Sequence, residues 1–278
     1  MSMTLFTSTG CLRCKIVKRF MEERGLAYEE KDIKADGREA FQKFYTANRK
    51  SVYRGPEGIE FPVFFDGVEI RQGLGAVIAY LHSGKKLDGL VSVGTLHKEW
   101  VDGLHVSGGD PAHAQEFLSV LRYLKGNNMK LRVDTNGKNS HILRQVFDEG
   151  LASQVVMDVV GPINLYGLIL GETVDAHDIK ESIALIPRFS EYRFETTVAP
   201  LIDQLGKVRY MTPREVAEAA RLIEESTGSK KHPYLILSFR PEKAADPLFK
   251  ALMPITPQEL LAYRTAAREY LVFADIEK

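Results

Sequence analysis

Short apolar stretches alternate with amphipathic stretches along the whole sequence, and this alternation limits the possible folds more than any other feature. Near the N-terminus, apolar segments predict strands at residues 3–7, 28–33, 59–65 and 68–70. Segments with apolar residues on one helical face predict helices at residues 15–24, 38–49 and 76–82. The pair Asp66-Gly67 predicts a hairpin turn between the last two strands. The predicted element order is therefore βαβαββα.

A longer alternation begins at residue 90. Candidate strands lie at 90–93, 103–107, 130–134, 154–158, 192–198, 234–238 and 271–276. Candidate helices lie at 112–126, 139–149, 175–187, 213–227 and 257–270. Several of these strands are apolar on both faces, which is typical of a parallel sheet covered by helices. Five helices are fewer than the eight of a closed barrel, so we predict a partial (β/α) barrel.

Local signals also mark the domain boundary and two helix starts. The polar, glycine-flanked stretch at 84–89 predicts a boundary between domains. We expect a first domain at 1–84, a linker or first barrel strand at 85–100, and the partial barrel at 101–278. Thr212-Pro213 and Thr256-Pro257, each followed by a glutamate, predict capped helix starts.

The charge balance narrows the range of partners. The 278 residues include 37 Lys+Arg and 37 Asp+Glu, so the formal net charge is zero. A general nucleic-acid or anionic-membrane binder would have an excess of basic residues, so we expect neither partner. Apolar runs fall short of the roughly 18–20 residues that a membrane span needs. The first residues do not resemble a signal peptide, and we therefore expect a cytoplasmic protein.

The two cysteines of the chain, Cys11 and Cys14, follow the first predicted strand and open the first predicted helix. Backbone N–H groups and the dipole at a helix N-terminus stabilise a thiolate, and Arg13 and Lys15 add positive charge. We expect Cys11 to be the exposed thiol that attacks a disulfide, and Cys14 to resolve the mixed disulfide. Two small core residues are the alternative interpretation. Two thiolates are too few for a zinc site or an iron–sulfur cluster that is held by four cysteines.

Residues 1–84 resemble glutaredoxins, through Cys11-Leu12-Arg13-Cys14, through Phe61-Pro62-Val63 before the turn, and through the element order. The resemblance implies a thioredoxin fold with a cis proline at Pro62, whose neighbouring backbone receives an extended thiol substrate. It implies a set of substrate-binding residues: Arg13, Lys15, Phe61, Pro62, Arg71, Gln72 and Gly73. Family members that use glutathione have a Gly-Gly pair where this chain has 70–75 without one. The reductant can therefore be glutathione or a thioredoxin-reductase-type partner.

The basic residues of the stretch 48–60, which are Arg49, Lys50 and Arg54, are either a binding feature or a solvated face.

Polar and glycine-containing motifs follow several strands of the second region. They are Ser107-Gly108-Gly109-Asp110-Pro111, Asp134-Thr135-Asn136-Gly137, 157–162 and 195–200. Because ligand sites form at the carboxyl ends of parallel strands, together they predict a pocket. Its candidate residues are Gly108, Gly109, Asp110, Asp134, Asn136, Asp158 and Thr196. Asp110 followed by Pro111 is also an ordinary helix cap.

From about residue 101, these motifs resemble radical S-adenosylmethionine enzymes that activate glycyl-radical proteins. Gly108-Gly109-Asp110-Pro111 resembles the family's Gly-Gly-Glu-Pro, which implies S-adenosylmethionine binding, and 239–241 also recurs in that group. The cluster-binding C-x-x-x-C-x-x-C is absent, and Val160 stands where the family has lysine. His97 and His105 are weak substitutes as ligands, so we predict no metal site and no radical chemistry.

The leading hypothesis is a thiol–disulfide oxidoreductase that reduces a protein or small-molecule disulfide and requires no cofactor. Its second domain, a partial barrel of radical-S-adenosylmethionine type without cluster ligands, would bind a protein partner or a ligand. A first alternative is an accessory protein that binds S-adenosylmethionine or a glycyl-radical-type partner, with the cysteine pair as a redox regulator. A second alternative is a [2Fe–2S] carrier with cysteines from two protomers.

Overall fold

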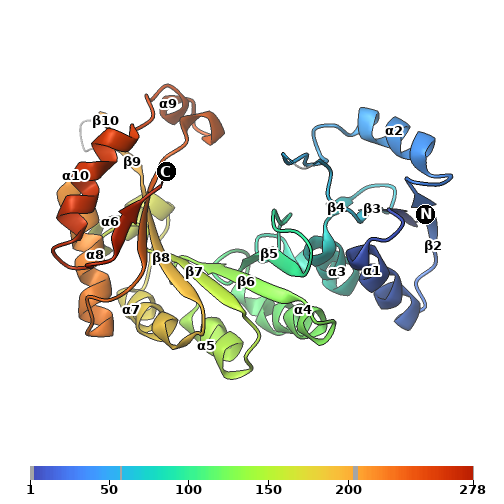
Figure 1. The fold of residues 1–278 in the computed structure, drawn as a ribbon, viewed down its shortest axis with the longest axis horizontal. Coiled ribbons are helices and arrows are strands. Elements are labelled where there is room, and N and C mark those ends of the chain that lie inside the picture. The colour runs from blue at the N-terminus through green and yellow to red at the C-terminus, as the bar shows by residue number, and fades with distance from the viewer. Residues whose placement is uncertain (1–2, 57, 203–205, 278) are drawn as a thin grey trace. The chain divides into compact units, whose positions relative to one another are not determined.

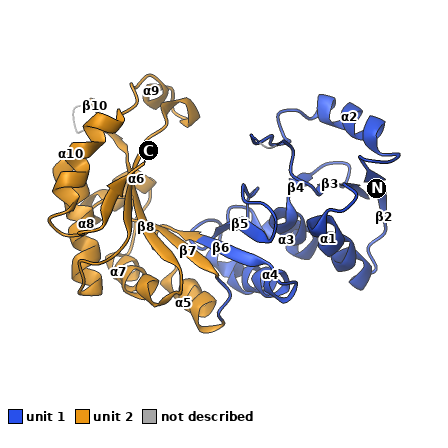
Figure 2. Ribbon diagram, viewed as in Figure 1, with its two compact units in different colours: residues 1–133, 150–152 blue, residues 134–149, 153–278 orange. Residues whose placement is uncertain are grey.

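The computed structural model describes residues 3–56, 58–202 and 206–277. The chain divides into two compact units, which Figure 2 shows in different colours. The first unit contains residues 1–133 and 150–152, and the second contains residues 134–149 and 153–278.

The first unit begins with a four-stranded sheet and three helices (Figure 1). These elements are β1 (Met3–Thr7), α1 (Leu12–Glu23), β2 (Tyr28–Asp32), α2 (Arg38–Ala47), β3 (Val63–Phe65), β4 (Ile70–Gln72) and α3 (Leu74–Ser83). The βαβαββα order predicted from the sequence is confirmed. The strand order is β2-β1-β3-β4, with β1 parallel to β2 and antiparallel to β3.

Helices α1 and α2 pack on this sheet through apolar and aromatic side chains. Helix α1 buries Ile16, Val17, Phe20 and Met21 and packs on α3, because these side chains recur at helical spacing. Helix α2 has no fully buried residue and attaches through aromatic rings. The rings of Phe41 and Phe44 lie 5.2 and 4.8 Å from that of Phe6 in β1, and Phe44 also contacts Phe65 in β3.

The remainder of the first unit packs against α3. It comprises β5 (Trp100–His105), α4 (Ala114–Gly126), most of β6 (Lys130–Thr135), whose last two residues belong to the second unit, and the 3-10 turns Gly84–Leu87 and Pro111–His113. Helix α3 contacts both α4 and β5. The strand predicted at 90–93 is wrong, because that segment makes only isolated bridges, of Val91 with Asp88 and with Leu104. The chain turns at Gly89, directly before this segment, where φ is +86°.

The second unit alternates strands and helices. Its elements are α5 (Ser140–Asp148), β7 (Gln154–Asp158), α6 (Ile163–Leu170), α7 (Ala176–Leu185), β8 (Tyr192–Val198), β9 (Pro200–Ile202), β10 (Val208–Tyr210), α8 (Pro213–Thr227), β11 (Tyr234–Ser238), α9 (Pro247–Lys250), α10 (Pro257–Ala267), β12 (Ala274–Ile276), and the 3-10 turns Ile186–Arg188 and Pro241–Lys243. Strand β8 is parallel to both β7 and β11, and β11 is parallel to β12. The six-stranded sheet has the order β12-β11-β8-β7-β6-β5, which fits a partial barrel.

Two helices of the second unit start as the sequence predicts. At α8, the Thr212 hydroxyl accepts from the Glu215 backbone N–H, and the Glu215 carboxylate accepts from the Thr212 N–H. The same capping box joins Thr256 and Glu259 at α10. Each box satisfies backbone donors that a helix start leaves without intrahelical partners.

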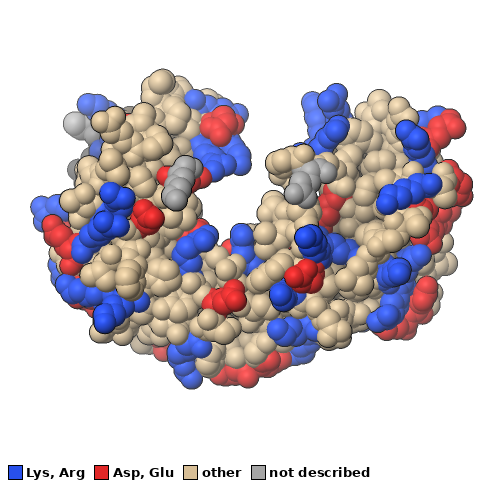
Figure 3. Space-filling view, viewed as in Figure 1, with Lys and Arg blue, Asp and Glu red and all other residues tan. Residues whose placement is uncertain are grey.

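Sequence patterns miss the short hairpin of β9 and β10, which pair antiparallel, and the helices α6 and α9. On the face in Figure 3, acidic and basic side chains are interspersed, in agreement with the zero net charge. Among the described residues, no helix is long and apolar enough to cross a membrane.

Candidate active site

Cys11 and Cys14 form a disulfide at the start of α1, with their Cα atoms 5.3 Å apart. Cys11 is the N-cap residue of this helix, and the Cys14 backbone N–H donates to its sulfur at 3.1 Å. Cys14 is only 2% exposed, whereas Cys11 is partly exposed and its neighbour Leu12 is 53% exposed. A reacting disulfide can therefore reach Cys11 and not Cys14.

The peptide bond between Phe61 and Pro62 is cis and lies beside this disulfide. The Phe61 carbonyl oxygen is 3.9 Å from the Cys11 sulfur. The Pro62 carbonyl accepts from the Gly73 N–H at 2.9 Å, whereas the Phe61 N–H has no partner among the residues that the structure describes. An unpaired backbone donor next to the sulfur can pair with an extended substrate.

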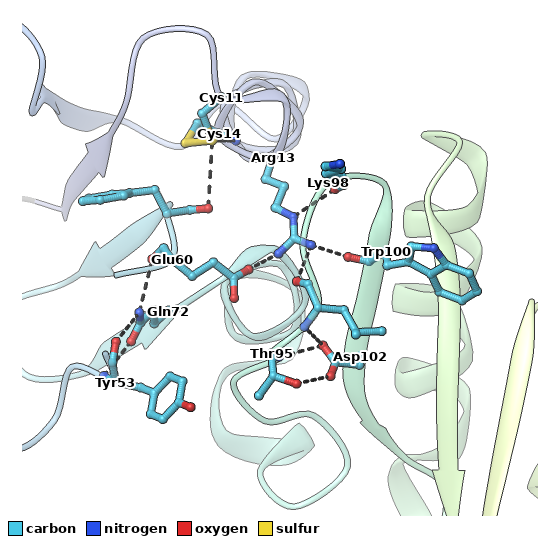
Figure 4. A network of polar contacts seen from close by, with 12 residues as sticks. Cys11, Arg13, Cys14, Tyr53, Glu60, Gln72, Thr95, Lys98, Trp100 and Asp102 are labelled. Carbon is cyan, nitrogen blue, oxygen red and sulfur yellow. Dashed lines mark hydrogen bonds and ion pairs between the residues drawn. A yellow bond between two sulfur atoms is a disulfide. The ribbon is translucent and has the colours of Figure 1, made fainter. Parts of the chain in front are cut away.

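Arg13 lies between the two cysteines in sequence but points away from them (Figure 4). It is 8% exposed, and its guanidinium forms an ion pair with Glu60. It also donates to the carbonyls of Leu96 at 2.6 Å and Lys98 at 3.2 Å, and to that of Trp100. The sequence predicts Arg13 as a substrate-binding residue, but these four bonds use four of its five N–H donors, and the side chain joins α1 to the segment 96–100.

Glu60 shares the environment of Arg13. Its side chain is 9% exposed, and its Oε2 atom has no hydrogen-bond partner. Burial raises the pKa of Glu60 above its ordinary value, and the opposing effect of the Arg13 guanidinium is smaller. Sequence reasoning missed this residue, although it directly precedes Phe61-Pro62.

The other residues predicted to bind substrate have different surroundings. The Gln72 side chain is buried and bonds the backbone N–H and carbonyl of Tyr53 at 2.8 Å each, so it holds a loop. Arg71 pairs with Asp88 at 2.8 Å and lies over the Tyr80 ring, and neither it nor Gly73 lines the cleft beside Cys11. Lys15 is exposed on α1, outside the lining of that cleft. Arg49, Lys50 and Arg54 are also exposed.

A cleft of about 530 Å³ opens beside Cys11. It is lined by the start of α1 at residues 11–13, by residues 58–61 and by residues 97–99. Of the residues predicted from the sequence, Cys11, Arg13 and Phe61 line this cleft. Residues 97–99 were missed as lining residues because they are more than 80 positions from the cysteines, and nothing in the local pattern connects them.

The predicted pocket residues of the second region fall in both units. Gly108 and Gly109 lie in the first unit against residues 88–90, and a Cβ atom on Gly108 would be 2.1 Å from the Gly89 carbonyl oxygen. These glycines therefore allow two loops to approach closely. Asp110 caps a 3-10 turn by accepting from the Ala112 N–H at 2.9 Å. The ordinary-cap interpretation thus accounts for this side chain.

The remaining four predicted pocket residues, Asp134, Asn136, Asp158 and Thr196, lie in the second unit. The Thr196 hydroxyl donates to the Val159 carbonyl at 2.5 Å, and the Asn136 side chain accepts from the Lys138 N–H. Asp158 ends β7, and its Oδ1 atom has no hydrogen-bond partner. Burial, together with the nearby Glu195 carboxylate, raises the pKa of Asp158 to about 7.

Within the described ranges, no group of three or more His, Cys, Asp or Glu side chains is placed to hold a metal ion. His105 bonds Ser92 at 2.9 Å, and His97 lines the cleft near Glu60.

Two comparisons with known proteins found a family model and a relative that this chain resembles. Residues 3–52 match the Glutaredoxin family model. The chain is also 24% identical over 180 residues to a protein of Methanocaldococcus jannaschii named "Putative glycyl-radical enzyme activating enzyme MJ1227". That alignment covers 62% of this chain and 69% of the relative.

Proposed function

We propose that this protein is a dithiol–disulfide oxidoreductase in which Cys11 attacks a substrate disulfide and Cys14 completes the exchange. The glutaredoxin match supports thiol redox chemistry in the N-terminal part of the chain. The observation that carries the assignment of roles is the difference in access, since Cys11 is partly exposed at a helix start and Cys14 is 2% exposed.

The reaction begins with both cysteines reduced. The Cys11 thiolate bonds one sulfur of the substrate disulfide, the substrate S–S bond breaks, and one thiolate leaves. The Cys14 thiolate then bonds the Cys11 sulfur and releases the second substrate thiolate, so that two electrons pass to the substrate. The Cys14 N–H, 3.1 Å from the Cys11 sulfur, and the helix dipole stabilise the attacking thiolate.

The backbone at Phe61 would position the substrate. Its N–H can donate to an extended segment that carries the substrate sulfur, and its carbonyl lies 3.9 Å from Cys11. Glutathione or a thioredoxin-reductase-type protein would restore the dithiol. A reducing compartment such as the cytoplasm fits a dithiol that must be kept reduced.

Rapid quenching of the reduced protein with a small disulfide tests this assignment. We expect Cys11→Ser to abolish the reaction, and Cys14→Ser to accumulate a mixed disulfide on Cys11 that mass spectrometry detects. Unchanged reduction in both variants would refute the proposal. A mixed disulfide on Cys14 in the Cys11→Ser variant would reverse the two roles.

For the second unit, we propose a binding role without radical chemistry. A C-x-x-x-C-x-x-C cluster site needs three thiolates, and the two cysteines of this chain are joined in the disulfide. The unpartnered Oδ1 atom of Asp158 at the end of β7 supports a ligand or partner at this edge of the sheet. Calorimetry with S-adenosylmethionine, with Asp158→Asn as the comparison, tests the small-molecule version, and an absence of heat with the wild type removes it.

A further inference from the structure

Most residues that line the cleft beside Cys11 lie outside the part of the chain that matches the Glutaredoxin family model. The match ends at residue 52, whereas residues 58–61 and, much further along the chain, His97, Lys98 and Glu99 also line the cleft. We call residues 97–99 the distal wall. All of these residues belong to the first unit, so their positions relative to Cys11 are set within one compact body.

The distal wall is fixed by hydrogen bonds on both of its flanks (Figure 4). On the N-terminal flank, the Asp102 carboxylate accepts from the backbone N–H groups of Thr95 and Leu96 at 2.8 and 2.9 Å, and from the Thr95 hydroxyl. Arg13 bonds the carbonyls of Leu96, Lys98 and Trp100. A segment held at so many points presents its side chains in a defined place.

Lys98 is the exposed basic side chain among the residues that line this cleft. The Glu60 carboxylate is paired with the Arg13 guanidinium, and Glu99 lies 3.6 Å from Lys130. The buried Asp102 carboxylate accepts from the backbone N–H groups of Thr95 and Leu96, so the acidic groups near the wall each have a partner, and the Lys98 ammonium group is exposed to the cleft. The start of α1, beside Cys11, carries the positive end of the helix dipole. An anionic group close to the reacting sulfur would therefore be attracted from two directions.

We infer that the distal wall determines substrate specificity and that Lys98 selects disulfides carrying a carboxylate near the S–S bond. This inference rests on the proposed oxidoreductase function. A cleft of about 530 Å³ has the size of sites that enclose small ligands, so the carboxylate can belong to a small molecule or to a flexible peptide end. Lys98 has a positive φ of 58°, which turns the backbone at the wall.

Three small disulfides of similar length test the inference by charge alone: 3,3′-dithiodipropionate is anionic, 2-hydroxyethyl disulfide is neutral and cystamine is cationic. The readout is the second-order rate at which the reduced full-length protein forms its Cys11–Cys14 disulfide at low ionic strength. For the wild type, we expect the anionic probe to react fastest and the cationic probe slowest. Added salt should reduce the rate differences among the three probes, because the Lys98 ammonium group and the charged group of the probe are both exposed to solvent.

Charge variants of Lys98 identify the wall as the origin of this order. Lys98→Glu should lower the rate with the anionic probe about fivefold to tenfold relative to the neutral probe, and raise the rate with cystamine. Lys98→Gly tolerates the positive φ and should remove most of the preference. Lys86→Glu is the matched control, since Lys86 is also exposed in the first unit but does not line the cleft; its probe order should stay that of the wild type.

The outcomes separate this inference from the proposed function. If wild type and Lys98→Glu reduce all three probes with the same order, the inference is overturned while the oxidoreductase assignment stands. The same conclusion follows if Lys86→Glu changes the order as much as Lys98→Glu does. If the wild type reduces none of the three probes, the proposed function and the inference fail together. A reversed order in Lys98→Glu alone supports both.

Discussion

Asp158 allows a sharp prediction about the stability of the second unit. Its carboxyl group has a pKa of about 7 in the folded protein, against an ordinary value of 3.8, because burial and the Glu195 carboxylate both oppose its charge. Between these two pH values, the folded state binds more protons than the unfolded state. The free energy of unfolding must therefore decrease as the pH rises through this window. Asp158→Asn removes the titration and keeps the side-chain size.

The magnitude follows from the two pKa values. The full shift is about 3 units, and each unit corresponds to 1.36 kcal/mol, so the group costs about 4 kcal/mol when it is ionised in both states. At pH 5 the unfolded carboxyl is already mostly charged, so part of this cost is present there. Integration from pH 5 to pH 8 gives a loss of about 2.5 kcal/mol from Asp158 alone.

Urea unfolding at pH 5 and pH 8, followed by circular dichroism, measures this loss. Hydrogen exchange of peptides from β7 and β8 assigns the transition to the second unit, because the single tryptophan, Trp100, belongs to the first. We expect the wild type to lose about 2.5 kcal/mol more than Asp158→Asn over this pH range. Asp148→Asn, at the end of α5, is the control and should behave as the wild type. Equal pH dependence in wild type and Asp158→Asn would refute the reasoning.

Three further changes test the packing described above. Arg13→Met should lower the unfolding free energy of the first unit by about 3–5 kcal/mol, because it leaves the Glu60 carboxylate buried without its partner. Adding Glu60→Gln should recover part of this loss in thermal unfolding followed by tryptophan fluorescence. Purely additive losses from the two substitutions would contradict the pairing. Thr212→Ala should cost about 1 kcal/mol in urea unfolding through loss of the capping box, and an unchanged midpoint would contradict that role. Gly108→Ala should cost about 1–3 kcal/mol, since its Cβ atom would lie 2.1 Å from a backbone oxygen. Gly126→Ala meets nothing within 4 Å and should be tolerated; similar losses in both alanine variants would argue against the close approach.

Sequence patterns correctly predicted those features of the structure that depend on residues close together in sequence. The βαβαββα order, the capping boxes at Thr212 and Thr256, and the position of Cys11 at a helix start all follow from spacing within a few residues. The strand predicted at 90–93 is wrong because a strand depends on contacts that local sequence does not show. Its composition is that of a strand, but a strand requires a partner over several residues, and this segment forms only isolated bridges with Asp88 and Leu104.

Long-range contacts explain what the sequence could not predict about the site. Between two cysteines at a helix start, an arginine is expected to strengthen the positive field, and nothing near it in sequence indicates another partner. Its partners are Glu60 and three carbonyl groups between residues 96 and 100, which are 47 to 87 positions away. A buried guanidinium with this many acceptors is satisfied, so burial is favourable although the residue type is usually exposed.

The first turn of α1 carries both the attacking cysteine and the arginine that holds the distal wall. The turn that places Cys11 at the N-cap also places Arg13 where its planar group can bond Glu60 and the backbone beside the distal wall. Lysine could not replace it there, because a single ammonium group cannot donate in one plane to acceptors spread over several residues. The distance between the attacking sulfur and the wall is therefore controlled by a side chain from the same turn as the nucleophile. Activation of the thiol at the start of α1 and the proposed selection of the substrate by Lys98 are therefore coupled through Arg13, whose bonds to Leu96, Lys98 and Trp100 connect the two regions.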